Sequence, residues 1–119
     1  MIIQNPLSEY LKNDPYTKER GYKTMFHLIR QWAEERNLIK GATPANQMLK
    51  MVEELGELAK AIGKKDMPEI IDGLGDCVVV LTILAAQHDL NLEDCIASAY
   101  NEIKDRRGKL INGVFVKEV

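Results

Sequence analysis

The chain has 119 residues, enough for one domain with a single hydrophobic core and too few for two. Hydrophobic residues make up 45% of it and charged residues 29%, the balance of an ordinary globular protein. The net charge of −2 provides no basic surface, so we expect neither nucleic acid nor an anionic membrane as a partner.

The start of the chain and its two cysteines predict a cytoplasmic location. Residues 1–6 lack the basic segment and the long apolar run of a secretory signal. The longest apolar run, residues 77–86, is too short to span a bilayer. Cys77 and Cys95 lack the spacing of metal ligands, and we expect both to be buried thiols in a reducing compartment.

Two helices are predicted in the first half of the chain. Residues 1–17 contain the turn signal Asn-Asp-Pro and are expected to form an N-terminal arm. Apolar residues then recur at helical spacing over residues 18–38, which predicts the first helix. The second helix begins with Thr43 as its N-cap and Pro44 as its first residue, and Gly63-Lys64-Lys65 ends it.

The second half of the chain predicts two more helices and a short hairpin. The third helix runs from Asp66, its N-cap, to about Gln87, and the fourth runs from Asn91, its N-cap, to about Arg107 with its apolar residues facing inward. Asn-Gly at 112–113 lies between two short β-prone runs and indicates a type I′ turn.

Together these elements predict an all-α fold. We expect an antiparallel bundle of about four helices that forms a single domain over residues 1–119, with residues 110–119 as a C-terminal hairpin or hook. After Asp76 the third helix is apolar on nearly every side, so a second subunit is expected to help cover it, and the protein is expected to be oligomeric.

Six acidic residues on the second and third helices are the candidate metal site. They are Glu53, Glu54, Glu57, Glu69, Asp72 and Asp76. At 100° per residue the first three lie within an arc of about 100°, and the last three within about 60°. The third helix contains no Lys or Arg to neutralise its acidic residues, and partly buried carboxylates are costly without a cation. The two clusters are therefore expected to converge on a hard divalent ion, Mg²⁺ or in its place Mn²⁺.

Less specific interpretations stay open for part of this set. The three glutamates of the second helix, taken alone, are more typical of a solvated helix face with Lys50 and Lys60 as ion-pair neighbours. Glu69 serves equally well as a helix-capping residue. Asp72 and Asp76 favour the metal site, because Asp is a poor helix former and like charges four residues apart repel. A di-iron site is excluded, since neither histidine has a Glu three residues before it.

Carboxylate-bound Mg²⁺ usually completes its shell with water and substrate phosphates. Candidate phosphate ligands follow at i, i+3 and i+6 on the fourth helix, although cations are equally common at a solvated helix end. These candidates are Asn101, Lys104 and Arg107, with Lys50 as a further one. Residues of the first helix are candidates for contacting a nucleobase, although such residues more often belong to the core and surface of an amphipathic helix. They are His27, Gln31 and Trp32.

The motif Glu53-Glu54-x-x-Glu57, followed by an acidic pair that ends in Leu74-Gly75-Asp76, resembles the MazG-like nucleotide pyrophosphohydrolases of the all-α NTP pyrophosphatase superfamily. Residues 101–109 and 112–117 are similar to short single-domain members found in phages, and the resemblance covers about residues 25–117. It implies a helical bundle that forms a homodimer or homotetramer, located in the host cytoplasm for a phage protein. It also implies Mg²⁺-dependent hydrolysis of a nucleoside triphosphate to the monophosphate and pyrophosphate.

One position departs from the family's second motif, which is Glu-x-x-Asp. Counting back from Asp76 places Gly73 where the Glu is expected, whereas Asp72 is adjacent and Glu69-x-x-Asp72 is itself a Glu-x-x-Asp. Either Asp72 replaces the missing ligand, or Glu69 and Asp72 set the register of metal binding.

We therefore expect cleavage of the α–β phosphoanhydride bond of an NTP or dNTP, with Glu54 and Glu57 as catalytic residues and Glu54 as the general base. The Gly73 departure leaves an alternative open, namely a non-catalytic helical module that binds a nucleotide or a protein through the same surface. A structural dimer whose acidic residues are merely solvated is a third interpretation.

Overall fold

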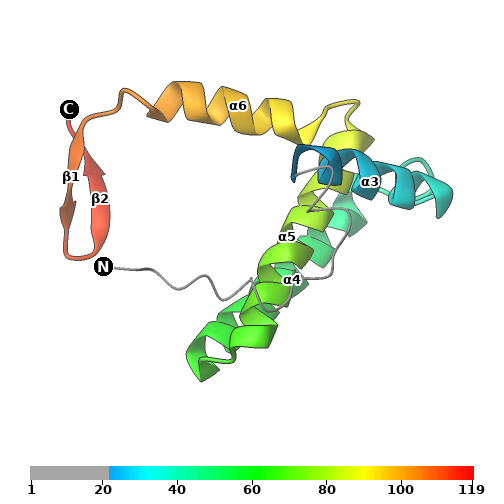
Figure 1. The fold of residues 1–119 in the computed structure, drawn as a ribbon, viewed down its shortest axis with the longest axis horizontal. Helices are drawn as coiled ribbons and strands as arrows, with labels where there is room; N and C mark the ends of the chain where they lie inside the picture. Colours follow the sequence, from blue (N-terminus) through cyan, green and yellow to red (C-terminus); the bar gives the residue numbers. More distant parts are fainter. Residues whose placement is uncertain (1–21) are drawn as a thin grey trace.

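The computed structural model describes residues 22–119, so the predicted N-terminal arm lies outside the described residues. Within them, four helices are followed by a two-stranded antiparallel hairpin (Figure 1). The elements are α3 (Tyr22–Glu35), α4 (Pro44–Lys64), α5 (Met67–Gln87), α6 (Leu92–Ile103), β1 (Gly108–Ile111) and β2 (Val114–Lys117). The predicted all-α fold of about four helices with a C-terminal hairpin is confirmed.

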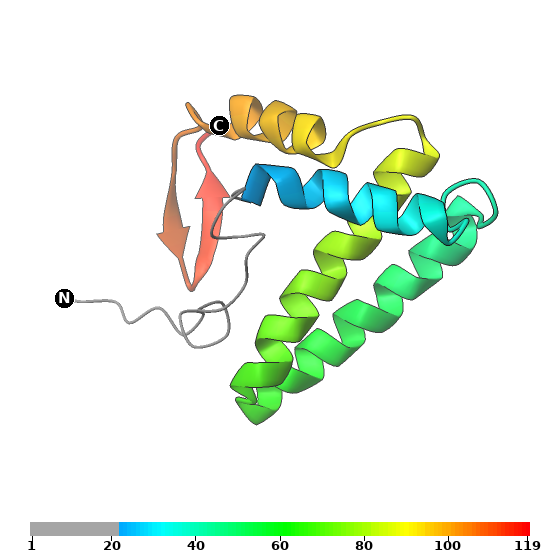
Figure 2. The same ribbon diagram turned by 45° about the vertical axis from the view of Figure 1, so that its right-hand side comes forward.

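The long helices α4 and α5 form the central antiparallel pair, and α3 lies across one end of it (Figures 1 and 2). Helix α6 leads away from the end of α5 and carries the hairpin at its far end. A small hydrophobic cluster joins α4 to α5: Met51, Leu58, Cys77, Val80 and Leu84. None of the helices within residues 22–119 is long and apolar enough to cross a bilayer.

Local capping explains where α4 and α5 begin and end. The N–H of Asn46 donates to Thr43 Oγ1 at 3.1 Å, so the predicted N-cap of α4 is confirmed. The N–H of Glu69 donates in the same way to Asp66 Oδ1 at 3.3 Å, which confirms the predicted cap of α5. The predicted end of α4 at residues 63–65 is confirmed: Lys64 is its last residue, and Lys65 has a left-handed φ of 57° that lets its N–H reach the last carbonyls of the helix.

The predicted end of the fourth helix and the burial of its apolar face are wrong. Helix α6 ends at Ile103, four residues before Arg107, because the chain turns there to enter β1. Ile96 and Tyr100, expected to face inward, are both at least half exposed, and α6 has no buried residue. Cys95 on this helix is exposed as well, so the expectation of buried thiols holds for Cys77 alone.

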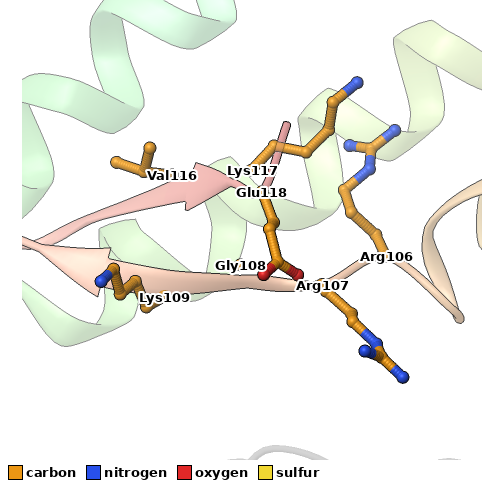
Figure 3. A pocket seen from close by; sticks show the side chains of 7 residues that line it. All are labelled: Arg106, Arg107, Gly108, Lys109, Val116, Lys117 and Glu118. Atoms are coloured by element: carbon orange, nitrogen blue, oxygen red, sulfur yellow. The ribbon is translucent and has the colours of Figure 1, made fainter.

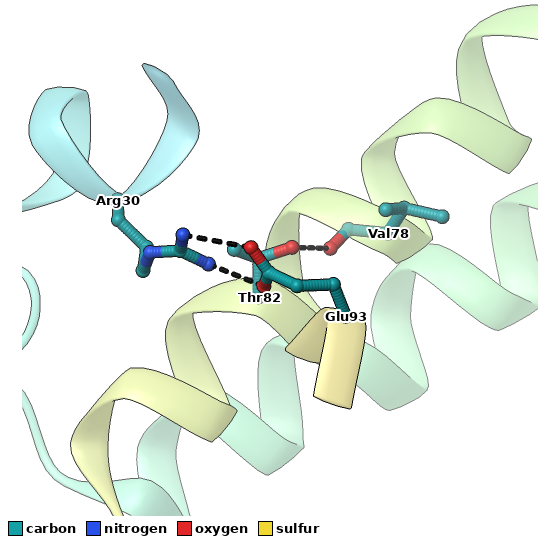
Figure 4. Close-up of polar contacts among 4 residues, drawn as sticks. All are labelled: Arg30, Val78, Thr82 and Glu93. Atoms are coloured by element: carbon teal, nitrogen blue, oxygen red, sulfur yellow. Dashed lines mark hydrogen bonds and ion pairs between the residues drawn. The ribbon is translucent and has the colours of Figure 1, made fainter. Parts of the chain in front are cut away.

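One ion pair fastens α3 to the start of α6 (Figure 4). The guanidinium of Arg30 donates to both carboxylate oxygens of Glu93, at 2.6 and 2.9 Å. The side chains are only 20% and 27% exposed, so water screens this pair weakly. Burial opposes the charged forms, but the hydrogen bonds from Arg30 prevail and lower the pKa of Glu93 below its usual range.

The hairpin follows the predicted turn chemistry. Asn112 and Gly113 have φ values of 51° and 80°, the two positive angles of a type I′ turn. The strands pair from Gly108 opposite Lys117 to Ile111 opposite Val114, and every residue of both strands is exposed.

Candidate active site

Two adjoining pockets lie along the α4–α5 pair and share Asp76. The first, with a cavity volume of about 420 Å³, is called here the apolar pocket; it is lined by Trp32, Leu38, Asn46, Gln47, Lys50, Glu54, Asp76, Val79, Val80 and Ile83. The second, of about 380 Å³, is called the acidic pocket; it is lined by Glu57, Lys60, Lys64, Glu69, Asp72, Gly73 and Asp76.

Glu54 is the buried carboxylate of the site, only 7% exposed on the inward face of α4. Its Oε1 lies 3.3 Å from the Nζ of Lys50, one helical turn earlier. Its Oε2 is buried without a hydrogen-bond partner. A buried carboxylate oxygen with no donor is costly, and such atoms are typical of sites that take a ligand or an ion.

Asp76 faces Glu54 from α5 and lies among other negative charges. Burial raises its pKa, and the charges of Asp72 and Glu54 raise it further, against a smaller opposing effect of Lys50. The local negative charge therefore exceeds what Lys50 neutralises. The free oxygen of Glu54 and the raised pKa of Asp76 fit an oxygen-ligated hard cation.

The six predicted carboxylates do not share one cavity. Glu54 and Asp76 line the apolar pocket, whereas Glu57, Glu69 and Asp72 line the acidic pocket beside Asp76. Glu53 is exposed, lines neither of these pockets and lies 3.5 Å from the Nζ of Lys50, as the solvated interpretation predicts for it. Among the residues that the structure describes, no three His, Cys, Asp or Glu side chains form a group spaced to hold a metal ion.

The acidic pocket also contains cations that the sequence of α5 does not supply. Lys60 and Lys64 of α4 line it opposite Asp72. In the sequence, neutralising cations were sought only on the helix that carries the acidic residues. In the structure, the lysines come instead from α4, which packs against that helix.

The predicted phosphate ligands do not all lie at the site either. Lys50 lies at the site, but Asn101 and Lys104 are exposed on α6 and at its end. Arg107 lines a separate pocket of about 620 Å³ at the base of the hairpin (Figure 3). The cations Arg106, Lys109 and Lys117 line that pocket too, with Glu118 as its acidic member. In both ribbon views the hairpin stands apart from α4.

Of the predicted base contacts, Trp32 alone lines the apolar pocket; His27 and Gln31 are exposed on α3 and line none of the pockets described above. The guanidinium of Arg36 lies 4.5 Å from the centroid of the Trp32 ring and covers one of its faces. Sequence reasoning missed Asn46 and Gln47, which line the same pocket. Their signal is their spacing, eight and seven residues before Glu54, which places them two helical turns away on the same side of α4.

Comparison with known proteins identifies the chain's relatives. The model of the MazG nucleotide pyrophosphohydrolase domain matches residues 42–111, more than half of the chain. An uncharacterized 18.2 kDa protein from the rep-hol intergenic region of Haemophilus phage HP1 (strain HP1c1) is 46% identical over 63 residues, which are 53% of this chain. The chain covers 39% of that protein's length. No solved structure matches the chain. The chain belongs to the MazG nucleotide pyrophosphohydrolase family.

Proposed function

We propose that the chain hydrolyses nucleoside triphosphates, NTP or dNTP, to the monophosphate and pyrophosphate in a reaction that depends on Mg²⁺. Family membership supports nucleotide pyrophosphohydrolysis. The observation that carries the proposal is Glu54, a buried carboxylate with one free oxygen, beside a partly buried Asp76. We infer a cytoplasmic site of action, where such substrates are found.

The carboxylates around Asp76 are the residues that would hold the ion. Glu54 and Asp76 come first, because they combine burial with excess negative charge. Asp72, Glu57 and Glu69 follow from the adjoining acidic pocket, and Glu53 lies outside it. When bound, Mg²⁺ or Mn²⁺ neutralises phosphate charge and makes a coordinated water a better nucleophile.

The chain's own residues supply proton transfer and orientation. The oxygen of the attacking water bonds to the α-phosphorus, the bond from phosphorus to the bridging oxygen breaks, and pyrophosphate leaves with that electron pair. Where Asp76 and the carboxylates of the acidic pocket hold the ion and leave Glu54 Oε2 free, that oxygen accepts the water's proton. Lys50 fixes the other oxygen of the same carboxylate and places positive charge beside the phosphates. Glu57 is the second candidate for the proton, from the acidic pocket.

Exposed apolar surface supports a homodimer or homotetramer. Large apolar side chains are exposed on α4 and α5 and on the hairpin, notably Val52, Leu55, Leu74, Leu110 and Phe115. The proposed phosphate contacts of Asn101, Lys104 and Arg107 then come from another copy of the chain. Light scattering after gel filtration measures this; a monomer at all concentrations would remove those three residues from the site.

A non-catalytic nucleotide-binding module is the second candidate. The position of Lys50 favours it, because this lysine already neutralises one oxygen of Glu54. So does the lack of a three-residue metal group within residues 22–119.

Substitution of Glu54→Gln separates the two candidates, since the amide keeps the shape but cannot accept a proton. If the chain is an enzyme, this variant should release pyrophosphate more slowly by about 10²-fold or more, and its helical circular dichroism spectrum should be unchanged. A folded variant with unchanged release would contradict the proposed role of Glu54. Glu34→Gln, at an exposed glutamate of α3 outside both pockets, is the control.

A further inference from the structure

The apolar pocket is arranged in a fixed order along α4. Asn46 and Gln47 lie at its N-terminal end, Lys50 follows one turn later, and Glu54 comes after one more turn. At 1.5 Å per residue, Gln47 and Glu54 are separated by about 10 Å along the helix axis. Along the pocket, the two amides therefore come first, the ammonium group of Lys50 follows, and the buried carboxylate of Glu54 comes last.

The end of the pocket near the amides suits a flat aromatic ligand. Its α5 wall is the apolar surface of Val79, Val80 and Ile83, and Trp32 closes it from α3. Arg36 covers one face of Trp32, yet the residue is still 43% exposed and lines the pocket. A cavity of about 420 Å³ lies within the range of small-molecule sites, which are mostly apolar with a few polar groups that fix orientation.

The two amides are the polar groups available at this end. Each presents a donor beside an acceptor, the pattern with which Asn and Gln recognise the edges of nucleobases. The backbone N–H of Asn46 is used by the Thr43 cap, which fixes where its side chain starts without using its amide. Gln47 is half-buried, so a hydrogen bond lost there is not freely replaced by water.

We propose that this end of the pocket selects the nucleobase and that Asn46 and Gln47 are its specificity-determining residues. The base lies against the apolar wall and Trp32 with its edge toward the two amides, and its phosphates run past Lys50 toward Glu54. The inference rests on the proposed function in one respect, that the ligand is a nucleotide; it does not require that the nucleotide be cleaved.

Trp32 is the single tryptophan of the chain and lines the pocket, so its fluorescence reports binding without any turnover. The probes are the nucleoside monophosphates of adenine, guanine, cytosine and uracil, titrated in the presence of EDTA. N-acetyl-tryptophanamide, titrated in parallel, corrects for absorption by the bases. The variants are Gln47→Ala and Asn46→Ala, with Glu34→Gln as the control.

The proposal predicts that the parent chain binds the four monophosphates with dissociation constants that span about tenfold or more. Gln47→Ala should reduce this span to about threefold, because the monophosphate with the preferred base should bind more weakly. Asn46→Ala should reduce the span by a smaller amount. The control should keep the full span. An equal span in the parent and both variants, or no fluorescence change with any of the four, would overturn the proposal.

A parallel assay of pyrophosphate release keeps the two conclusions separate. If base-dependent binding is present and release is absent, the proposed hydrolysis fails and base selection stands. If release is present while both amide variants keep the parent's ranking of the triphosphates, the hydrolysis stands and the role of the amides fails.

Discussion

Lys50 Nζ lies 3.3 Å from Glu54 Oε1, and the other oxygen of that carboxylate is buried without a partner. The lysine is half exposed, whereas the glutamate is almost fully buried, so the pair bridges the surface of α4 and the inside of the pocket. The ion pair orients the Glu54 carboxylate and leaves its other oxygen without a hydrogen-bond partner.

Replacing Lys50 by Met should leave Glu54 buried without its cation. We expect kcat/KM to fall by about 10²-fold, because both the orientation of Glu54 and the charge beside the phosphates are lost. We also expect the free energy of unfolding to fall, as urea denaturation can measure, because Glu54 stays buried without its partner. Lys50→Arg keeps the charge and should retain most of both quantities; a Met variant as active as the parent would remove Lys50 from the site.

Asp76→Asn should separate activity from stability. Turnover should be abolished, because the proposed ligand that lines both pockets loses its charge. Burial and the charges of Asp72 and Glu54 disfavour the ionised form of Asp76, as its raised pKa indicates. The neutral amide should therefore raise the melting temperature of the metal-free protein by about 2–4 °C, as scanning calorimetry can measure. A lower melting temperature with normal helical content would contradict the charge excess described here.

The position where the family's second motif has Glu lines the acidic pocket in this chain but is crowded by Leu58 of α4. A Cβ built on Gly73 would lie 3.2 Å from Leu58 Cδ1 and 3.3 Å from its Cβ, so a side chain there would be directed at α4. Asp72, one residue earlier, lines the acidic pocket. Geometry thus favours Asp72 as the substitute for the missing ligand.

This predicts the outcome of a motif swap. Asp72→Asn should lower kcat/KM by about tenfold or more, and adding Gly73→Glu to that variant should not restore it. The double variant should also be less stable than the single one by about 1–3 kcal/mol, because the Glu side chain must displace Leu58. Rescue of activity by Gly73→Glu would show that position 73 reaches the site after all.

The ion pair between Arg30 and Glu93 should make stability depend on pH. The pKa of Glu93 is lowered by its hydrogen bonds from Arg30, so its contribution is present above the unfolded pKa of about 4.3 and is lost as the pH falls through the folded pKa. Glu93→Gln should cost about 1–3 kcal/mol at pH 7, and the difference from the parent should shrink toward zero in acid. Urea denaturation across this range measures it; a constant difference would show that the pair's charge is unimportant.

The sequence predicted the helices and the caps of α4 and α5 well because those signals are local, whereas Asn91 lies at the N-cap of α6 without a capping hydrogen bond from its side chain. Thr43 and Asp66 each meet a backbone N–H three residues later, which needs no tertiary contact. The Asn-Gly turn is set by two residues in the same way. The end of α6 was missed because a helical pattern continues through residues that the chain uses to turn toward β1.

The site was predicted only in part because helix periodicity shows which side of a helix a residue lies on but not how deeply it is buried. Glu53, Glu54 and Glu57 share an arc of α4, yet packing against α5 buries Glu54 and leaves the other two exposed. The roles of Asn46 and Gln47 depend on Trp32 and α5 closing a pocket around them, which no pattern within α4 encodes.

Pyrophosphate release is the measurement that decides whether the chain hydrolyses the α–β bond of a nucleotide in a metal-dependent way. Canonical NTPs and dNTPs would be assayed with Mg²⁺, with Mn²⁺ and with chelator, using the parent chain and Glu54→Gln. We expect release of one pyrophosphate per monophosphate with either metal, no release with chelator, and a loss of about 10²-fold or more in the variant. A folded parent chain that releases no pyrophosphate from any of these substrates would contradict the proposed hydrolysis.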